Sequence, residues 1–285
     1  MNQGIFIQTN NSQLLAAKVA KFAIQSRGCA SRHGIPVTLM NVEENESFRA
    51  FSGAEYRLGS SRLRYDVAGI QSFTLSRFMA PELMGYSGRA LVIDPDILAL
   101  EDVRPLFTLD LQDNPIAACR RHDGWESSVM LLDCAKLSHW RIADILKDLR
   151  TLRSDYYELI TLKAEQGVLE LPSVWNSRDQ IVPEIKMLHM TQVLTQPWKT
   201  GLPVEFGARE VAKIFQPIPW KPIRRLLSKR VTHYRPHPLP EIERIFMTLL
   251  KDAVDAGEVT EADIADSIRS GFVRADLRER ISRLH

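Results

Sequence analysis

Arg89-Ala90-Leu91-Val92-Ile93-Asp94-Pro95-Asp96 is the stretch of this chain that constrains its fold and its chemistry most strongly. Its apolar run is short and is bounded by charged residues, which predicts a strand buried inside a sheet. Asp94 and Asp96 follow directly, so we expect their carboxylates to emerge where that strand meets solvent. Two carboxylates a few ångströms apart repel each other by roughly 4 kcal/mol at an effective dielectric constant of about 20.

A bound cation relieves such a repulsion. Oxygen ligands suit Mg²⁺ or Mn²⁺, which keep coordination positions open for phosphate oxygens. Asp94 and Asp96 therefore predict metal-assisted chemistry on a substrate that carries phosphate. The same spacing is also compatible with a capped strand end or a solvated turn.

The first forty residues predict a β-α-β unit. Ile5–Thr9 is a short apolar strand, and Ser12 is expected to cap a helix over Gln13–Gln25, whose apolar positions recur at helical spacing. Ile35–Met40 is the second strand. This order predicts an α/β protein with parallel strands and right-handed connections.

Further along, residues 41–70 are polar and mixed, and predict a loop over one face of the sheet. The remaining elements expected before residue 205 alternate between helix and strand. They are a helix over Phe73–Pro81, strands over Pro115–Cys119 and Ser128–Leu132, and a helix over Leu137–Leu152.

The character of the chain changes after about residue 205. Six of the fifteen prolines, at 217, 219, 222, 236, 238 and 240, flank a basic segment in which apolar and cationic residues interleave over 220–230. Such a segment can lie on an anionic membrane surface or can pack as an ordinary basic helix. Helices are expected over Glu241–Ala256, over Glu261–Arg269 with Thr260 as its cap, and over Ala275–Leu284. We therefore expect a domain over 1–205, a proline-rich basic connection over 206–240 and a helical extension over 241–285.

Composition excludes several classes of protein. A hydrophobic fraction of 45% and a charged fraction of 25% are those of an ordinary globular protein. The formal net charge of +2 predicts no general affinity for nucleic acid. No apolar run reaches the length of a transmembrane helix, and the N-terminus lacks the pattern of a secretory signal. The three cysteines are widely spaced, which favours a reduced, cytoplasmic setting.

Four motifs accompany the Asp94/Asp96 strand in a fixed order. One precedes it and three follow: Ser76–Leu83, Ser127–Asp133, Leu171–Asn176, and His189 with Gln196–Trp198. This order resembles glycosyltransferase family 8, whose members are retaining enzymes that use nucleotide sugars. The resemblance covers about residues 5–200. It implies a GT-A fold, which is a Rossmann-like, mixed and mostly parallel sheet flanked by helices, here with a C-terminal helical extension.

The resemblance also implies roles for single residues. Asp94, Asp96 and His189 would hold Mn²⁺ (or Mg²⁺) on the diphosphate of the donor. The end of the first strand would hold the base and ribose, and Arg77 would contact the donor. The full set of donor-binding positions is Thr9, Asn10, Asn11, Arg77, Asp94, Pro95, Asp96 and Trp198.

Catalytic positions follow from the chemistry of the transfer. Departure of the diphosphate leaves an oxocarbenium-like sugar, whose charge Asp155, Glu158 or Glu126 could stabilise. Gln196 stands where the family has a phosphate-binding lysine, and it can donate a hydrogen bond but no charge. The tryptophan–asparagine pair of the family falls on Trp175 and Asn176.

The expected activity is transfer of a hexose from a nucleoside diphosphate sugar, with a UDP-sugar favoured, to a hydroxyl of a saccharide, lipid-linked or protein acceptor. We expect it to depend on metal and to retain configuration. Two other functions stay open: a non-catalytic nucleotide-sugar binder, and a phosphatase of the haloacid dehalogenase type, because Ala90–Asp96 also resembles its strand and D-x-D motif. We expect a cytoplasmic protein, either free or at the inner face of the membrane through 220–230. The final helices could cover that face, form a homodimer contact or shape the acceptor site.

Overall fold

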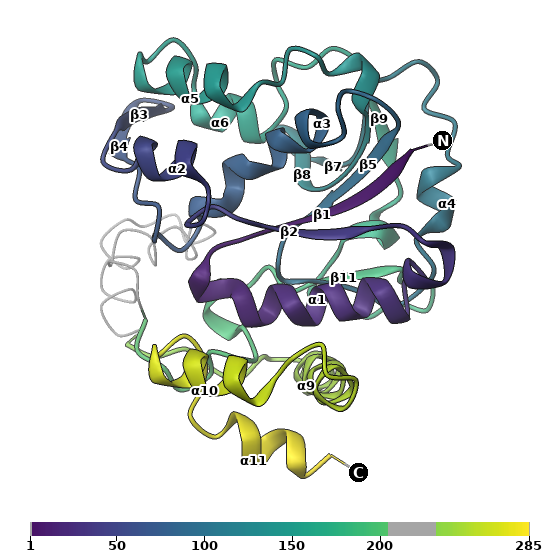
Figure 1. Cartoon of the computed structure of the whole chain (residues 1–285), viewed down its shortest axis with the longest axis vertical. Coiled ribbons are helices and arrows are strands. Elements are labelled where there is room, and N and C mark those ends of the chain that lie inside the picture. The colour runs from purple at the N-terminus through teal and green to yellow at the C-terminus, as the bar shows by residue number, and fades with distance from the viewer. Residues whose placement is uncertain (1, 205–231, 285) are drawn as a thin grey trace. The chain divides into compact units, whose positions relative to one another are not determined.

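A computed structural model describes residues 2–204 and 232–284 of the chain (Figure 1). The chain forms two compact units, Met1–His189 and Met190–His285, so the first unit ends before the domain boundary expected after residue 205. Most of the proline-rich segment expected over 206–240, including the membrane contact expected at 220–230, lies outside the described residues. No helix within 2–204 and 232–284 has the length and apolarity that crossing a membrane requires.

A six-stranded sheet forms the centre of the first unit, in the order β2-β1-β5-β8-β7-β9. Pairing is parallel for β2 with β1, β1 with β5 and β7 with β9, whereas β8 runs antiparallel to both of its neighbours. The strands are β1 (Gln3–Thr9), β2 (Val37–Asn41), β5 (Arg89–Ile93), β7 (Ile116–Arg121), β8 (Gly124–Asp133) and β9 (Val168–Leu171). The predicted fold class, a mixed and mostly parallel sheet flanked by helices, is confirmed.

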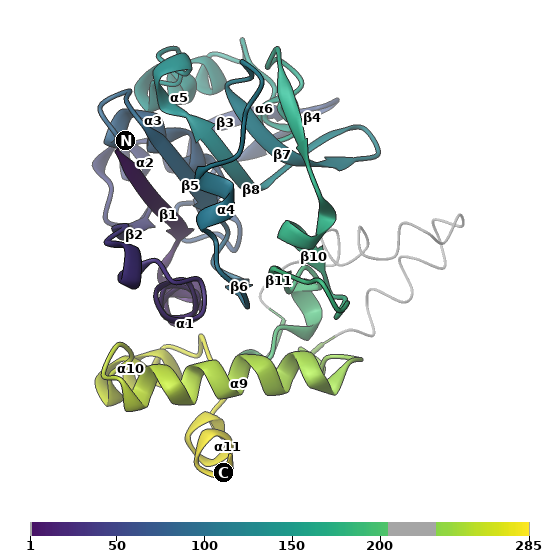
Figure 2. The same ribbon diagram turned by 90° about the vertical axis from the view of Figure 1, so that its right-hand side faces the viewer.

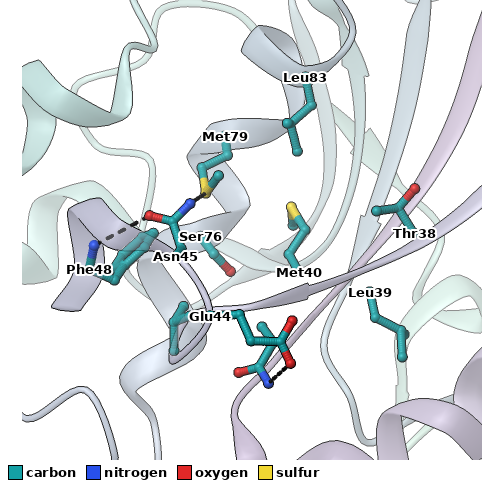
Figure 3. A pocket seen from close by; sticks show the side chains of 11 residues that line it. Thr38, Leu39, Met40, Glu44, Asn45, Phe48, Ser76, Met79 and Leu83 are labelled. Atoms are coloured by element: carbon teal, nitrogen blue, oxygen red, sulfur yellow. Dashed lines mark hydrogen bonds between the residues drawn. The ribbon is translucent and has the colours of Figure 1, made fainter.

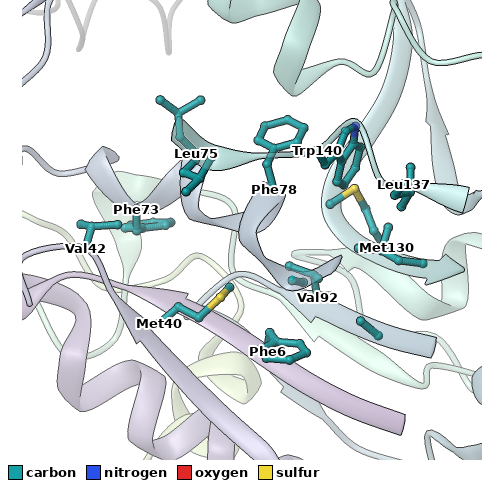
Figure 4. Close-up of a cluster of buried hydrophobic side chains, with 14 of the residues drawn as sticks. Phe6, Met40, Val42, Phe73, Leu75, Phe78, Val92, Met130, Leu137 and Trp140 are labelled. Atoms are coloured by element: carbon teal, nitrogen blue, oxygen red, sulfur yellow. The ribbon is translucent and has the colours of Figure 1, made fainter. Parts of the chain in front are cut away.

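Both faces of the sheet are covered, because side chains along a strand alternate between them. One face packs against α1 (Leu14–Ser26), which contacts both β1 and β2. The opposite face carries Phe6, Val92 and Met130 in a large apolar cluster (Figure 4). That cluster is closed by the 3₁₀ helix η3 (Ser72–Met79) and by α3 (Ala80–Leu83) and α5 (Ile142–Arg150).

The central strand β5 explains why the Asp94/Asp96 segment reaches an edge of the sheet. Its residues 90–93 are fully buried between β1 and β8, as the apolar run predicts. Ile7 of β1 pairs with Ile93, so the parallel strands β1 and β5 end at the same level. The side chains that follow both strands therefore meet at one edge.

Two local predictions are wrong. Residues 41–70 are not a simple loop, because they contain α2 (Glu46–Phe51) and a hairpin of β3 (Glu55–Leu58) and β4 (Ser61–Arg64). Phe48 and Phe51 of α2 are buried in the apolar cluster, which stabilises a helix that its polar composition conceals. Ser12 is not the cap either: the short 3₁₀ helix η1 (Asn11–Gln13) precedes α1, and the Asn10 side chain accepts from the Gln13 N–H.

The other predicted elements are present, most of them with shifted bounds; α10 has the predicted bounds. The helix expected over 73–81 is mainly the 3₁₀ helix η3, and the one expected over 137–152 is the shorter α5. Shorter helices complete this unit. They are η2 (Ser31–His33), α4 (Arg104–Phe107), η4 (Cys134–Lys136), α6 (Tyr156–Ile160) and η5 (Ser173–Asn176).

A second, three-stranded sheet lies at the edge where β5 ends. Its order is β10 (Ser177–Arg178), β11 (Met187–His189) and β6 (Ile97–Ala99), and Figure 2 shows these short strands beyond the tip of β5. Because β6 begins directly after Asp96, this sheet ties the D-x-D segment to a much later part of the chain.

In the second unit, the described part contains η6 (Val193–Thr195), α9 (Pro240–Asp255), α10 (Glu261–Arg269) and α11 (Leu277–Ser282). Thr260 caps α10 as predicted, in a capping box with Asp263. Trp198 is fully buried and packs on Phe246, with 4.8 Å between the ring centroids.

A substitution at Gly88 tests the backbone packing at the start of β5, the strand that ends at Asp94. It precedes β5 with φ at +73°, and a β-carbon there would lie 2.2 Å from the Asn2 carbonyl oxygen. Gly85 has φ at +60° but open space around it. We expect Gly88→Ala to lower the free energy of unfolding by about 3 kcal/mol and Gly85→Ala by only about 1 kcal/mol. Urea denaturation of both variants checks this, and equal losses would contradict the close approach of β1 to Gly88.

Candidate metal centre

The Asp94–Ile97 segment is a tight turn between β5 and β6. The Asp94 N–H donates to the Ser128 carbonyl oxygen at 3.1 Å, and the Ile97 N–H donates to the Asp94 carbonyl oxygen at 3.3 Å. Pro95 stands inside this turn, where its lack of an N–H costs no hydrogen bond. The turn brings Asp94 and Asp96 close together, with side chains that are 16% and 15% exposed.

His189 reaches this turn through strand pairing. It pairs with Ile97 across β11 and β6, so it lies next to Asp96. Its Nε2 is 3.4 Å from an oxygen of Asp96. Ligand atoms of Asp94, Asp96 and His189 all lie within 4.8 Å of one another. The structure thus brings together the three residues predicted to hold a metal ion.

Asp94 is held from one side by a buried cation and a buried amide. Arg77, which is 4% exposed, donates through Nη2 to Oδ1 of Asp94 at 3.0 Å. Gln8, which is fully buried, donates through Nε2 to the same oxygen. Within the described part of the chain, Oδ2 of Asp94 has no hydrogen-bond partner. One oxygen is therefore fixed by the protein, and the other is available to a ligand.

Asn176 orients His189. Its Oδ1 lies 2.8 Å from Nδ1 of the imidazole, and its Nδ2 donates to the Ser128 hydroxyl at 3.0 Å. An amide oxygen can only accept, so Nδ1 of His189 carries a proton, and Nε2, on the Asp96 side, is the nitrogen that would bind a metal ion. Such a partner fixes the tautomer and the ring orientation of a metal-binding histidine.

The electrostatics of the cluster indicate a missing positive charge. Burial raises the pKa of Asp94 to about 6; Arg77 opposes this shift, and the neighbouring Asp96 adds to it. Burial alone would lower the pKa of His189, but Asp96 and Asp94 outweigh it, so the pKa is raised. The raised pKa values of Asp94 and His189 are both expected in a poorly hydrated site that carries excess negative charge.

A divalent cation fits these residues. The donor set is two carboxylates and one neutral imidazole nitrogen, which suits Mn²⁺ and also Mg²⁺. An uncompensated pair of carboxylates this deeply buried is costly, and Arg77 neutralises only one of them. The bound Oδ1 of Asp94 and the held ring of His189 are the contacts expected around metal ligands.

An irregularity in β8 shapes the wall of the site. The register of β7 against β8 shifts between Ala118 and Cys119, so three residues of β8, 127–129, have no counterpart on β7. Such bulges are frequent beside active sites, where they redirect side chains. Here Ser127 accepts from Nη1 of Arg77, and Ser128 binds Asn176. Glu126, at the start of the irregularity, acts electrostatically on both Asp94 and His189.

The predicted base and ribose residues follow β1 at the same edge. Thr9 and Asn10 are fully buried, and Asn11 is exposed. Asn10 donates to the Gly69 carbonyl oxygen at 2.8 Å, and Asn11 donates to Glu43. These bonds fix the loop beside β1 near the candidate centre, so the predicted contact with a nucleoside stays a prediction.

Asp155 has a structural role in this fold. Its Oδ1 caps α6 by accepting from the N–H groups of Tyr157 and Glu158, and its Oδ2 accepts from the Gly59 N–H at 2.7 Å. Arg57 is 3.3 Å from the same oxygen. A carboxylate used in this way is less available to a substrate, so its expected catalytic role stays a prediction.

Gln196 and Trp198 belong to the second unit. Gln196 is 4% exposed and Trp198 is fully buried. Oε1 of Gln196 and Nε1 of Trp198 have no hydrogen-bond partner among residues 2–204 and 232–284. Their expected roles, in catalysis and in donor binding, stay predictions.

A pocket of about 250 Å³ lies beside the edge strand β2, and none of the predicted site residues lines it (Figure 3). Its lining comes from β2, the loop that follows β2, α2, η3 and α3. The residues are Thr38, Leu39, Met40, Asn41, Val42, Glu44, Asn45, Phe48, Ser76, Met79 and Leu83.

A family model described as glycosyl transferase family 8 matches residues 11–155, just over half of the chain. This chain belongs to glycosyltransferase family 8. The match spans Asn11, Arg77 and the D-x-D turn, and the resemblance predicted from the motifs is confirmed. As a member of this family the protein is a glycosyltransferase. No curated protein sequence matches the chain.

Several solved structures of glycosyltransferases are similar. The galactosyltransferase LgtC, solved with donor and acceptor sugar analogues, shares 17% identity over 69% of this chain and 89% of LgtC, with a TM-score of 0.48. GlyE of Streptococcus pneumoniae TIGR4 shares 17% identity over 83% of this chain and 65% of GlyE, with a TM-score of 0.48. Mouse xyloside xylosyltransferase 1 shares 14% identity over 67% of this chain and 97% of that enzyme, with a TM-score of 0.39.

Sequence reasoning missed Gln8 and assigned no position-specific role to Ser127 or Ser128. Gln8 is a polar residue inside an otherwise apolar strand, and that interruption was the available signal. A buried amide needs partners, so its presence one residue before Thr9 indicates a polar network at the strand end.

Asn176 provides a direct test of the metal centre. We expect Asn176→Ala to weaken Mn²⁺ binding by about 10- to 100-fold, because the His189 ring loses the acceptor that fixes it. Asn176→Asp keeps that acceptor and should bind Mn²⁺ nearly as tightly as the wild type. Calorimetric titration with Mn²⁺ measures both affinities.

Asn114→Ala is the matched control, because Asn114 also donates from a partly buried side chain, there to the Leu111 carbonyl oxygen at 2.8 Å. Its Mn²⁺ affinity should equal that of the wild type. Unchanged binding in Asn176→Ala would show that His189 is not a ligand or is held by other contacts.

Proposed function

We propose that this protein transfers a hexose from a UDP-sugar to an acceptor hydroxyl, with Mn²⁺ bound at Asp94, Asp96 and His189 and with retention of configuration. The observation that carries the proposal is the convergence of these three residues at one sheet edge, with ligand atoms within 4.8 Å. Family membership supplies the reaction class. The choice of UDP, of a hexose and of Mn²⁺ rests on the family resemblance and on the oxygen-rich donor set.

Mn²⁺ at this site would act as a Lewis acid on the diphosphate of the donor. The protein's contribution is to hold the ligands in place before the substrate arrives. Arg77 and Gln8 fix one oxygen of Asp94, and Asn176 fixes the ring of His189. Preorganised groups of this kind stabilise developing charge without reorganising during the reaction.

Retention places the acceptor on the face that the leaving group vacates, so the departing phosphate can accept the proton of the acceptor hydroxyl. No separate general base is then needed. A carboxylate that stabilises the oxocarbenium-like sugar is still expected, and Glu126 suits this role better than Asp155. The charge of Glu126 raises the pKa values of both Asp94 and His189, whereas Asp155 is bound by three backbone N–H groups.

The donor nucleoside is assigned to the end of β1, where Thr9, Asn10 and Asn11 follow Gln8. Gln196 and Trp198 are proposed to contribute from the second unit, Gln196 by donating to the diphosphate. The acceptor, which could be a saccharide, a lipid-linked sugar or a protein, is left to experiment. A cytoplasmic location, peripheral membrane contact and a homodimer stay predictions.

The activity test uses UDP-glucose and UDP-galactose and measures released UDP. We expect release with Mn²⁺, none with excess EDTA, and at least about a 100-fold loss in Asp96→Asn, because removing a ligand charge weakens the metal site. Proton NMR of the sugar product should show the α-anomer.

Asp102→Asn serves as the control, since Asp102 is also paired with an arginine, Arg104, but on the surface. It should keep full activity. UDP binding without release, even with several acceptors, would support a non-catalytic binder. Release of inorganic phosphate from simple phosphoesters, independent of UDP-sugars, would support the phosphatase.

A further inference from the structure

Two arginines converge on Glu126 beside the metal centre. Nη1 of Arg178 lies 3.0 Å from Oε1 of Glu126, and Nε of Arg121 lies 3.8 Å from the same oxygen. Arg121 belongs to β7, Glu126 to β8 and Arg178 to β10, so three separate strands bring these groups together. The Glu126 side chain is only 17% exposed and holds the two arginines near one point.

The position of Arg178 relative to the metal ligands follows from strand register. Arg178 pairs with His189 across the parallel strands β10 and β11. Neighbouring strands lie about 4.8 Å apart, and paired residues project their side chains to the same face of the sheet. Arg178 therefore lies on the His189 side of the small sheet, and its salt bridge to Glu126 points in the same direction.

Both arginines keep hydrogen-bond donors for a ligand. A guanidinium has five N–H donors, and within the described chain Arg178 uses only Nη1 for an ion pair. Arg121 uses only Nε, toward Glu126 and, at 3.0 Å, toward Asp123. The side chains are 53% and 35% exposed, so their remaining donors face solvent. A fork of N–H groups binds phosphate oxygens in a bidentate manner, which a single lysine cannot do.

The local charge also favours an anion once a metal ion is bound. Without metal, the carboxylates of Asp94, Asp96, Glu126 and Asp123 outnumber the guanidiniums of Arg77, Arg121 and Arg178. A divalent cation reverses this balance. A phosphate group would then meet a net positive region beside the reacting centre.

We propose that Arg121 and Arg178 form a phosphate-binding subsite next to the metal centre, with Glu126 positioning Arg178 and with Asp123 and Glu126 together positioning Arg121. The subsite deepens the proposed glycosyl transfer and rests on it for its role in turnover. A phosphate at this point belongs either to the diphosphate of the donor or to a phosphorylated acceptor. The chemistry of recognition is the same, and the experiment separates the two sources.

The test compares Arg121→Gln, Arg178→Gln and the double variant with Arg104→Gln. Arg104 is the matched control, because its side chain is 55% exposed and is paired with a carboxylate, as Arg178 is. Calorimetric titrations at saturating Mn²⁺ use three probes: UDP, uridine as its uncharged reference, and glucose 6-phosphate added after UDP.

A donor phosphate predicts that the double variant binds UDP about tenfold or more weakly and uridine as tightly as the wild type does. An acceptor phosphate predicts unchanged UDP binding and an equal loss for glucose 6-phosphate. Either result supports the subsite. Unchanged affinity for both UDP and glucose 6-phosphate in the double variant overturns it, as does a wild-type protein that binds neither probe.

Glu126→Gln should change the affinity for the phosphate-bearing probe in the opposite direction from the arginine variants. Removing the carboxylate frees Arg178 and removes one negative charge beside Arg121, which keeps its ion pair with Asp123, so we expect the phosphate-bearing probe to bind about three- to tenfold more tightly. That gain should disappear when Arg121→Gln and Arg178→Gln are added. A gain that persists without the arginines would come from general electrostatics and would count against the subsite.

Failure of the subsite and failure of the proposed function are distinguishable. Full UDP release with arginine variants that bind both probes normally removes the subsite and leaves the transferase. No UDP release from any UDP-hexose, combined with arginine-dependent binding of UDP or glucose 6-phosphate, leaves the subsite and removes the function.

Discussion

The repulsion between Asp94 and Asp96 is the constraint on which the first unit of this protein depends. Their carboxylates are largely buried at the end of β5, where water can do little to screen them. Arg77 neutralises one charge from inside the fold, and the remaining charge would be offset by a divalent cation. The raised pKa values of Asp94 and His189 express the same imbalance, because each group would take up a proton to reduce it. The end of β5 thus places an incompletely neutralised pair of carboxylates at the candidate metal centre.

A network of buried polar side chains makes that arrangement stable. Gln8 and Ser127 complete the bonds of Arg77, while Ser128 and Asn176 link the irregular part of β8 to His189. Buried polar groups are expensive unless they are paired, so each member of such a network fixes the others. The same bonds that hold the fold together also set the orientation of the metal ligands. Glu126 pairs with Arg121 and Arg178, which are more exposed than the buried network. We propose that the N–H donors of these two arginines bind an anion.

The candidate site residues differ in how many of their polar atoms already bind other parts of the protein. Asp155 was a reasonable candidate for a catalytic carboxylate, yet three backbone N–H groups and Arg57 use its oxygens. Among the described residues, the Glu126 carboxylate pairs with Arg121 and Arg178, and its charge contributes to the raised pKa values of Asp94 and His189. Trp198 packs on Phe246 in the core of the second unit, which gives it a structural role whatever else it does.

The sequence by itself determined the central strand, which an apolar run bounded by charged residues predicts, and the fold class and the family, which follow from the order of the motifs around that strand. It also predicted that Asp94, Asp96 and His189 lie together. It also determined the capping of α10 by Thr260, which depends only on neighbouring residues. Only the tertiary structure decided which polar side chains serve the centre. Gln8, Arg178 and Ser128 come from different strands, and their contacts depend on register, on the β8 irregularity and on burial, none of which leaves a local pattern. For the same reason α2 was hidden in 41–70, since Phe48 and Phe51 stabilise it only by packing against distant residues.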